Sequence, residues 1–208
     1  GADVLVGDAG NDQFRRVVLG TPPAATASVL AGTGNDAGGL TGENGPATTA
    51  TLGKAGGIAV GSDGAIYFSD SSLGTIRKVL NGTISTYAGM SGQFGFSGNG
   101  QPRLQTILNS PSGLAFINAT DLQFNERNNQ IVRKIQNDTV VAVGGYVAQA
   151  GYQGDGYDAT MAKFNSPLGA AVDGNGDFYI ADSGNFALRV IGRNGIVGAI
   201  AGNQGGLD

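Results

Sequence analysis

The fold of this chain is decided by residues 177–190, DFYIADSGNFALRV. An apolar run with high β propensity leads into Asp182, a Ser-Gly-Asn turn follows, and a second apolar run carries Arg189. Two apolar runs on either side of a short polar turn predict a β-hairpin. The predicted hairpin carries an acidic residue at the end of its first strand and an arginine seven positions later.

The same hairpin pattern occurs four times along the chain. Its acidic residues are Asp8, Asp70, Glu126 and Asp182, and the matching arginines are Arg15, Arg77, Arg133 and Arg189. The last two steps between the acidic residues are both 56 residues (126 − 70 and 182 − 126), and the glycines at 57, 113 and 169 keep that step. Self-similarity at a fixed period predicts an array of identical supersecondary units.

Each complete unit is predicted to contain four short strands. In the second unit the apolar runs lie at 57–60, 65–69, 75–80 and 83–87. Asn81-Gly82 joins the last two runs, and Asn-Gly between apolar runs is a strong hairpin signal. Repeated units of four antiparallel strands are typical of propeller blades that pack face to face around an axis. We therefore predict an all-β fold, a β-propeller of four-stranded antiparallel blades.

The chain is predicted to form one array of about 3.75 blades over residues 1–208. The expected divisions are a partial blade at 1–32, blades at about 33–89, 90–145 and 146–202, and the start of a next linker at 203–208. The partial blade has strands two to four, so its inner strand is missing. Either the chain is a fragment, or a neighbouring subunit supplies the strand, or four blades close the ring. An unpaired strand is a template for another chain.

The composition excludes several kinds of site. The 208 residues include 38 Gly but no Cys and no His. Without these two side chains, Ser-His-Asp triads, thiol nucleophiles and imidazole or thiolate metal sites are excluded. A net charge of −4 disfavours attraction to phosphate backbones, and no apolar run approaches the ~20 residues of a membrane span. We expect neither a nucleic-acid partner nor membrane insertion.

The most regular unit, residues 154–190, resembles a known repeat. Its first part reads GDGYDATMAKFNSPLGAAV, and its second part ends in DFYIADSGNFALRV. These motifs resemble NHL repeats of the long bacterial and extracellular kind, and the resemblance extends over essentially the whole chain. Leu73, Glu126 and Arg127 depart from the pattern in the other units. The resemblance implies a propeller, commonly of six blades, that serves mainly as a binding or scaffolding platform.

The four acidic residues have two interpretations. Carboxylates at turns beside Asn suit hard cations, and residues 1–12 also resemble one calcium-binding nonapeptide of RTX proteins. We favour a structural role, in which each carboxylate accepts turn amides and faces the arginine seven positions on. One carboxylate per blade is spread around the ring, so the four cannot share an ion. We expect no metal ion or cofactor, with calcium as the alternative.

Three asparagines begin glycosylation acceptor sequences. They are Asn81, Asn118 and Asn137, and all three lie in predicted hairpin turns, where a glycan meets no steric obstacle. We treat them as candidate glycosylation sites in a secreted protein.

These observations favour a non-enzymatic extracellular or cell-surface module. We expect protein partners or copies of the chain itself to bind through the unpaired strand or the linker face, with glycans as additional ligands. The module would then act in protein–protein interaction and structural assembly. One alternative is a propeller enzyme, similar to lyases and lactonases, with carboxylate-bound calcium. A second is an RNA-binding platform, which the overall negative charge disfavours.

Overall fold

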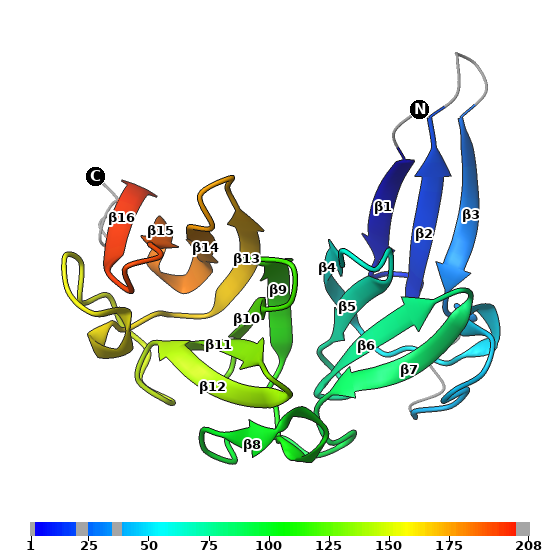
Figure 1. Ribbon diagram of the computed structural model, residues 1–208, viewed down its shortest axis with the longest axis horizontal. Coiled ribbons are helices and arrows are strands. Elements are labelled where there is room, and N and C mark those ends of the chain that lie inside the picture. Colours follow the sequence, from blue (N-terminus) through cyan, green and yellow to red (C-terminus); the bar gives the residue numbers. More distant parts are fainter. Residues whose placement is uncertain (1–2, 20–24, 35–38, 203–208) are drawn as a thin grey trace.

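A computed structural model describes residues 3–19, 25–34 and 39–202. These residues form four antiparallel sheets, which are the four blades of a β-propeller (Figure 1). The predicted all-β propeller is therefore confirmed. No helix in the described ranges is long and apolar enough to cross a membrane.

The four sheets contain strands of two to six residues. The first sheet consists of β1 (Asp3–Asp8), β2 (Gln13–Val18) and β3 (Thr26–Ala31). The second consists of β4 (Ala55–Val60), β5 (Ile66–Asp70), β6 (Thr75–Leu80) and β7 (Thr83–Ala88). The third consists of β9 (Pro111–Phe116), β10 (Leu122–Glu126), β11 (Ile131–Gln136) and β12 (Thr139–Gly144), with the short β8 (Gln101–Pro102) on its outer edge.

The fourth sheet repeats the order of the second. It consists of β13 (Pro167–Val172), β14 (Phe178–Asp182), β15 (Ala187–Ile191) and β16 (Val197–Gly202). Four single-turn 3-10 helices lie between strands: η1 (Ala47–Thr49), η2 (Arg103–Gln105), η3 (Ala159–Met161) and η4 (Ser183–Asn185).

The blades follow one another in a row around a common centre. Their inner strands β4, β9 and β13 are neighbours, and β1 contacts β4 from the first blade. Figure 1 shows the first and fourth blades at the two ends of this row. Within the described ranges, no hydrogen-bonded ladder joins these two blades.

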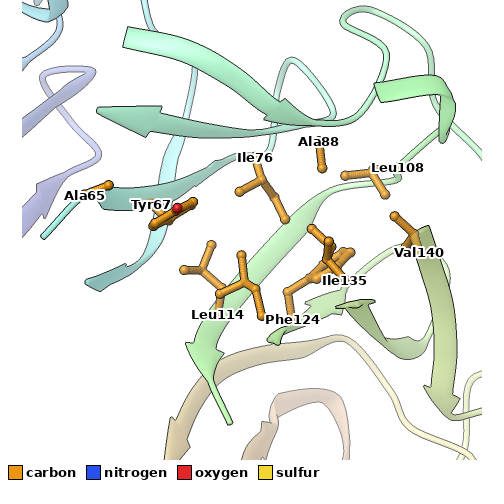
Figure 2. Close-up of a cluster of buried hydrophobic side chains, with 10 residues drawn as sticks. Ala65, Tyr67, Ile76, Ala88, Leu108, Leu114, Phe124, Ile135 and Val140 are labelled. Atoms are coloured by element: carbon orange, nitrogen blue, oxygen red, sulfur yellow. The ribbon is translucent and has the colours of Figure 1, made fainter. Parts of the chain in front are cut away.

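Neighbouring blades pack their apolar faces against each other, and linker residues such as Leu52 and Phe164 complete the buried clusters. The ring of Phe14 lies 4.1 Å from the ring of Phe68 across the first interface. Ile76 and Phe124 belong to one buried cluster across the second interface (Figure 2). The third interface buries Val132 and Ile180 in the same way. The hydrophobic core is therefore a series of equivalent layers between neighbouring blades.

A glycine with positive φ follows the outer strand in each of the first three blades. Gly32 and Gly89 have φ values of 98° and 97°, and Gly145 has 88°. A Cβ on Gly89 would overlap the carbonyl oxygen of Gly74 in the adjacent strand turn. The Gly89 amide donates a hydrogen bond to the carbonyl of Arg103 at 2.9 Å. This bond joins the beginning of the linker after β7 to η2 in the same linker. Only glycine combines this backbone conformation with this close approach.

We predict that Gly89→Ala destabilises the protein by about 1–3 kcal/mol, because the methyl group meets both a forbidden φ and a backbone oxygen. Gly92→Ala is the matched control, since Gly92 also has positive φ, 76°, but nothing lies within 4 Å of its added Cβ. Urea unfolding measures both changes. Equal losses in the two variants would show that the close approach contributes nothing.

Candidate functional site

The acidic residue and the arginine of each hairpin lie on one face of their sheet. In the fourth blade Arg189 pairs with Ile180, two residues before Asp182, so alternation directs both charged side chains to the same side. Arg189 Nη1 lies 3.4 Å from Asp182 Oδ2. In the third blade Arg133 Nη1 lies 3.2 Å from Glu126 Oε1. All four side chains are fully buried, and we call this pair the acid–arginine joint.

The second blade separates the two members of the joint. Arg77 Nη2 binds Glu43 Oε2 at 2.9 Å, and no salt bridge forms between Arg77 and Asp70. Asp70 instead accepts hydrogen bonds from the amides of Gly53 at 2.8 Å and Leu73 at 3.2 Å. The direct contact expected between Asp70 and Arg77 does not form, because Glu43 of the linker places its carboxylate beside the guanidinium.

An asparagine three positions after the acidic residue completes the joint in the third and fourth blades. Asn185 Nδ2 donates to Asp182 Oδ2 at 2.8 Å and to the carbonyl of Gly151 at 2.7 Å. Asn129 donates to the Glu126 carboxylate and to the carbonyl of Gly95. Sequence reasoning assigned these asparagines only to turns. The signal that reveals their second role is the constant spacing of three from the acidic residue.

A polar residue in each linker binds the blade that follows it. Glu43, Asn99 and Asp155 are 56 residues apart (99 − 43 and 155 − 99). Glu43 Oε1 accepts from the Thr86 amide at 2.6 Å, and Asn99 Oδ1 accepts from the Ala142 amide at 2.7 Å. Asp155 Oδ1 lies 2.6 Å from Arg189 Nη2. The joint therefore attaches the linker to its blade.

Aromatic rings from the linkers cover the buried guanidinium groups. The Arg133 guanidinium lies 5.0 Å from the Phe96 ring centre, and the Arg189 guanidinium lies 4.5 Å from that of Tyr152. A cation over an aromatic face is attracted by the ring quadrupole. These rings therefore stabilise the buried guanidinium groups.

Burial dominates the electrostatics of the joint. It raises the pKa of Glu126 to about 7, against the attraction of Arg133, which lowers the pKa. Burial also raises the pKa of Asp70 and Asp182 and lowers the pKa of Arg77 and Arg133. The cost of removing these charges from water thus exceeds their mutual attraction, as is usual for buried ion pairs.

The joint of the first blade is incomplete in the described residues. Arg15 Nη1 lies 3.7 Å from Asp8 Oδ2, and the two side chains are 41% and 23% exposed, whereas the joint residues of the third and fourth blades are fully buried. Asn11 Nδ2 donates to both Asp8 carboxylate oxygens at 2.9 Å, which keeps the spacing of three. The first blade therefore has the same side chains with fewer contacts.

The wall nearest the centre consists mainly of backbone and small side chains. Gly57, Gly113 and Gly169 of the three inner strands border a cavity of about 490 Å³, together with Ile58 and Leu114. Among the described residues, no group of three or more His, Cys, Asp or Glu side chains is arranged to hold a metal ion. The acidic residues that sequence reasoning considered as ligands lie apart, each in its own blade.

A pocket of about 450 Å³ lies between the second and third blades. The rings of Tyr87 and Phe116 pack edge-on against Tyr67, with centres 4.8 and 5.0 Å away. Asp63 and Arg103 also line the pocket, each in an ion pair with a neighbouring side chain. This pocket combines residues of two blades and was not foreseen from the sequence.

The three candidate glycosylation asparagines are all exposed. Asn81 and Asn137 occupy the turns before β7 and β12 with φ values of 50° and 48°. Asn118 lies in the turn between β9 and β10, where its Oδ1 accepts from the Asp121 amide at 2.8 Å. Asn118 and the other two sites therefore remain predictions, placed on accessible turns.

The comparison with protein families decides the type of repeat. Residues 164–191 match the NHL repeat. This segment of the fourth blade is an NHL repeat. The match begins at Phe164 before β13 and ends at Ile191, the last residue of β15, so it includes the acid–arginine joint of the fourth blade. A comparison with curated protein sequences gave no match.

Solved propellers share the fold of this chain at low sequence identity. One is the nidogen/laminin complex, at 15% identity and a TM-score of 0.63, covering 100% of this chain and 64% of that chain. Another is virginiamycin B lyase from Staphylococcus aureus, at 14% identity and a TM-score of 0.54, covering 95% and 51%. A third is an auxiliary nutrient binding protein from Bacteroides ovatus, at 15% identity and a TM-score of 0.56, covering 96% and 54%.

These similarities show the fold alone. The chain spans between 51% and 64% of the length of the three similar structures.

We predict that the free energy of unfolding falls as the pH rises through about 7, because folded Glu126 holds its proton more tightly than the unfolded side chain, whose ordinary pKa is 4.5. Its contribution is fully present below about pH 4.5 and is lost through about pH 7. Glu126→Gln removes this titration, so the fall should be smaller in that variant. Urea unfolding at a series of pH values measures it.

Asp63→Asn is the control for this pH series. A hydrogen bond from Lys78 lowers the pKa of the exposed Asp63, so the contribution of Asp63 to stability is present above about pH 4 and is lost as the pH falls further. Asp63→Asn should therefore lower stability by a constant amount between about pH 5 and pH 8 and leave the slope over that range unchanged. Wild type and Glu126→Gln with the same slope between about pH 5 and pH 8 would contradict the assignment to Glu126.

Proposed function

We propose that this NHL propeller is a non-enzymatic structural and interaction module, extracellular or at the cell surface, that assembles with copies of itself. The observation that carries the proposal is the pair of blade faces, at the two ends of the row, that no described residue covers. Their side chains correspond, position by position, to the side chains that are buried at the three interfaces inside the chain.

The forward face of a blade is marked by the residue six positions after its acidic residue. Phe14, Ile76 and Val132 hold this position in the first three blades and have 0% exposure. Leu188 holds it in the fourth blade and is 38% exposed. A following blade covers the first three of these residues, whereas within residues 3–19, 25–34 and 39–202 no blade covers the same kind of surface on the fourth blade.

The backward face is marked by the residue two positions before the acidic residue. Phe68, Phe124 and Ile180 hold this position in the last three blades and have 0% exposure. Val6 holds it in the first blade and is 40% exposed. The first blade therefore presents the surface that would receive a forward face.

A second copy of the chain fits these two faces. Every interface inside the chain places a forward face on a backward face, so Leu188 of one copy would pack against Val6 of the next, as Phe14 packs against Phe68. Contacts between two different faces are heterologous and produce rings when they close and filaments when they do not. Burial of apolar surface supplies the driving force.

The comparisons support an interaction role for this fold. One similar structure is a nidogen/laminin complex and another is a nutrient binding protein, which motivates the proposed extracellular or surface location and a protein partner. The lyase among the similar structures represents the enzymatic alternative. In the fourth blade, Asp155 and Asp182 both bind Arg189, so these carboxylates are engaged in structure.

The enzymatic alternative requires a bound cation, and calcium suits carboxylate oxygens. Titration calorimetry with calcium tests it directly. Stoichiometric binding that is lost in a carboxylate variant would favour that alternative over the proposed module.

We predict that the molar mass in solution rises with protein concentration, above the 20.8 kDa of one chain, because the two end faces associate. Light scattering after size exclusion measures the mass. Leu188→Asp or Val6→Asp should each hold the chain at the mass of a monomer. Phe94→Asp is the matched control, since Phe94 is exposed in a linker away from both faces and its change should not alter assembly.

Mixing the two variants tests the direction of association. Val6→Asp keeps an intact forward face and Leu188→Asp keeps an intact backward face, so an equimolar mixture should form dimers and stop there. A wild-type mass equal to one chain at every concentration, or a mixture that remains monomeric, would overturn the proposed self-assembly.

We predict that secretion from a eukaryotic cell adds N-linked glycans at Asn81, Asn118 and Asn137, because all three lie on exposed turns. Intact-mass measurement before and after enzymatic deglycosylation detects them, and Asn→Gln variants assign each site. An unchanged mass after secretion would contradict this expectation.

A further inference from the structure

The pocket between the second and third blades lies at the opposite end of the strands from the acid–arginine joints. In β5 the joint residue Asp70 is the last residue, whereas Tyr67, which lines the pocket, is the second. The other lining residues come from β7, β9, β11, η2 and the turns β4–β5, β9–β10 and β11–β12. The pocket is therefore separate from the joints and from the two end faces.

Three aromatic rings form the apolar wall of this pocket. Tyr67 is 5% exposed and belongs to the buried cluster between the two blades (Figure 2). The rings of Tyr87 and Phe116 meet the Tyr67 ring at angles of 79° and 77°. Both of these rings are only partly buried, so they offer apolar surface to a ligand. Ligand pockets typically combine such surface with a few polar groups.

Packing between blades does not require aromatic residues at these positions. The residues 56 positions later are Gln123, Val143 and Val172 (123 − 67, 143 − 87 and 172 − 116). At the first junction, two of the same positions are held by Leu5 and Val60. The cavity bordered by Gln123 and Val143 measures about 320 Å³, against about 450 Å³ for the aromatic pocket. The second junction thus has larger side chains and still a larger cavity.

The charges around the pocket balance each other. Lys78 Nζ lies 2.8 Å from Asp63 Oδ2, and Arg103 Nε lies 2.6 Å from Asp138 Oδ1. Each cation therefore has one carboxylate beside it, and the four side chains have no net charge. Because neither sign is in excess, the pocket favours a neutral ligand over an anion or a cation.

The two cations also lie against the aromatic rings. Lys78 Nζ is 5.2 Å from the centre of the Tyr67 ring, and the Arg103 guanidinium is 4.5 Å from that of Tyr87. A ring face attracts a cation through its quadrupole, and here the chain itself supplies the cations. A positively charged ligand would meet repulsion from Lys78 and Arg103, which argues against a quaternary ammonium group.

Polar groups remain accessible at the mouth of the pocket. The side chains of Asp63 and Asp138 are 44% and 68% exposed, and the neighbouring Asn137 is exposed as well. Hydrogen bonds from a hydroxyl group to a carboxylate are stronger than those to a neutral acceptor. A pyranose ring has hydroxyl groups around its edge and C–H groups on its faces, so it matches both the carboxylates and the aromatic wall.

We propose that this pocket binds one neutral sugar ring, either as a free monosaccharide or as the terminal unit of a glycan. Tyr87 and Phe116 contact the C–H face of the ring, and Asp63 and Asp138 accept hydrogen bonds from its hydroxyl groups. This site adds a ligand of defined chemistry to the proposed structural and interaction role. It does not depend on association of the end faces.

Titration of the full chain, produced in bacteria without N-linked glycans, tests the site. The probes are the methyl glycosides of glucose, galactose, mannose and N-acetylglucosamine. The chain has six Tyr and no Trp, so its intrinsic fluorescence comes from tyrosine and includes both pocket tyrosines. At least one sugar should give a saturable change, whereas tetramethylammonium and inorganic phosphate should give none.

An oligosaccharide that ends in the sugar that binds distinguishes the two sources of the ligand. Affinity at least equal to that of the methyl glycoside would identify the terminal unit of a glycan. Loss of binding would identify a free monosaccharide.

Two variants locate the binding site. Tyr87→Val and Phe116→Val introduce the residue that the next unit has at the same position, so the blades should still pack. Each variant should weaken binding at least about tenfold, because aromatic surface that contacts the sugar is lost. Tyr146→Val is the matched control, since Tyr146 is exposed in a linker and does not line the pocket. Circular dichroism checks that every variant is folded.

The outcomes separate this inference from the proposed self-assembly. The sugar site would be overturned if no sugar gave a saturable change, if either charged probe bound more tightly than every sugar, or if both folded valine variants kept the wild-type affinity. Sugar binding by a chain that stays monomeric would retain the site and reject self-assembly through the blade faces. Concentration-dependent assembly without sugar binding would do the opposite.

Discussion

The dominant constraint on this protein is that a four-stranded blade buries its apolar face mainly against a neighbouring blade. The contact of Phe14 with Phe68 has equivalents at Ile76 with Phe124 and at Val132 with Ile180. In such an array, stability is approximately a sum over units and nearest-neighbour interfaces. Among the described residues, the second and third blades each pack against two neighbouring blades, whereas the first and fourth blades each pack against one.

The acid–arginine joint determines the path of the linker. A buried guanidinium with several donors needs several acceptors, and only part of these come from its own hairpin. Asp182 supplies one acceptor to Arg189, and the linker supplies Asp155. Because an unpaired buried charge is costly, the linker is held close to the blade it precedes. The joint thus sets loop conformation by electrostatics where no regular secondary structure does so.

The sequence predicted the parts of the fold that depend on local chemistry. Apolar runs and turn residues such as Asn81-Gly82 located hairpins, and the step of 56 residues identified the blades. Contacts made by the Gly-rich linkers were not predictable in the same way. Arg77 binds Glu43, 34 residues earlier, because the linker folds back over the blade, and no periodic pattern reveals that path. The pocket beside Tyr67 escaped prediction because two different blades build it.

The repetition of one forward-to-backward contact at every junction also has an evolutionary consequence. An in-frame duplication or deletion of about 56 codons would insert or remove one whole unit and join surfaces that already match. Such an event would need no simultaneous redesign of a core. The glycine contact between inner strands, at Gly57 and Gly113, repeats with the same step. The inner strands could therefore also accommodate the insertion or removal of a unit. Genes encoding this kind of array can therefore change length in single steps and still yield folded products.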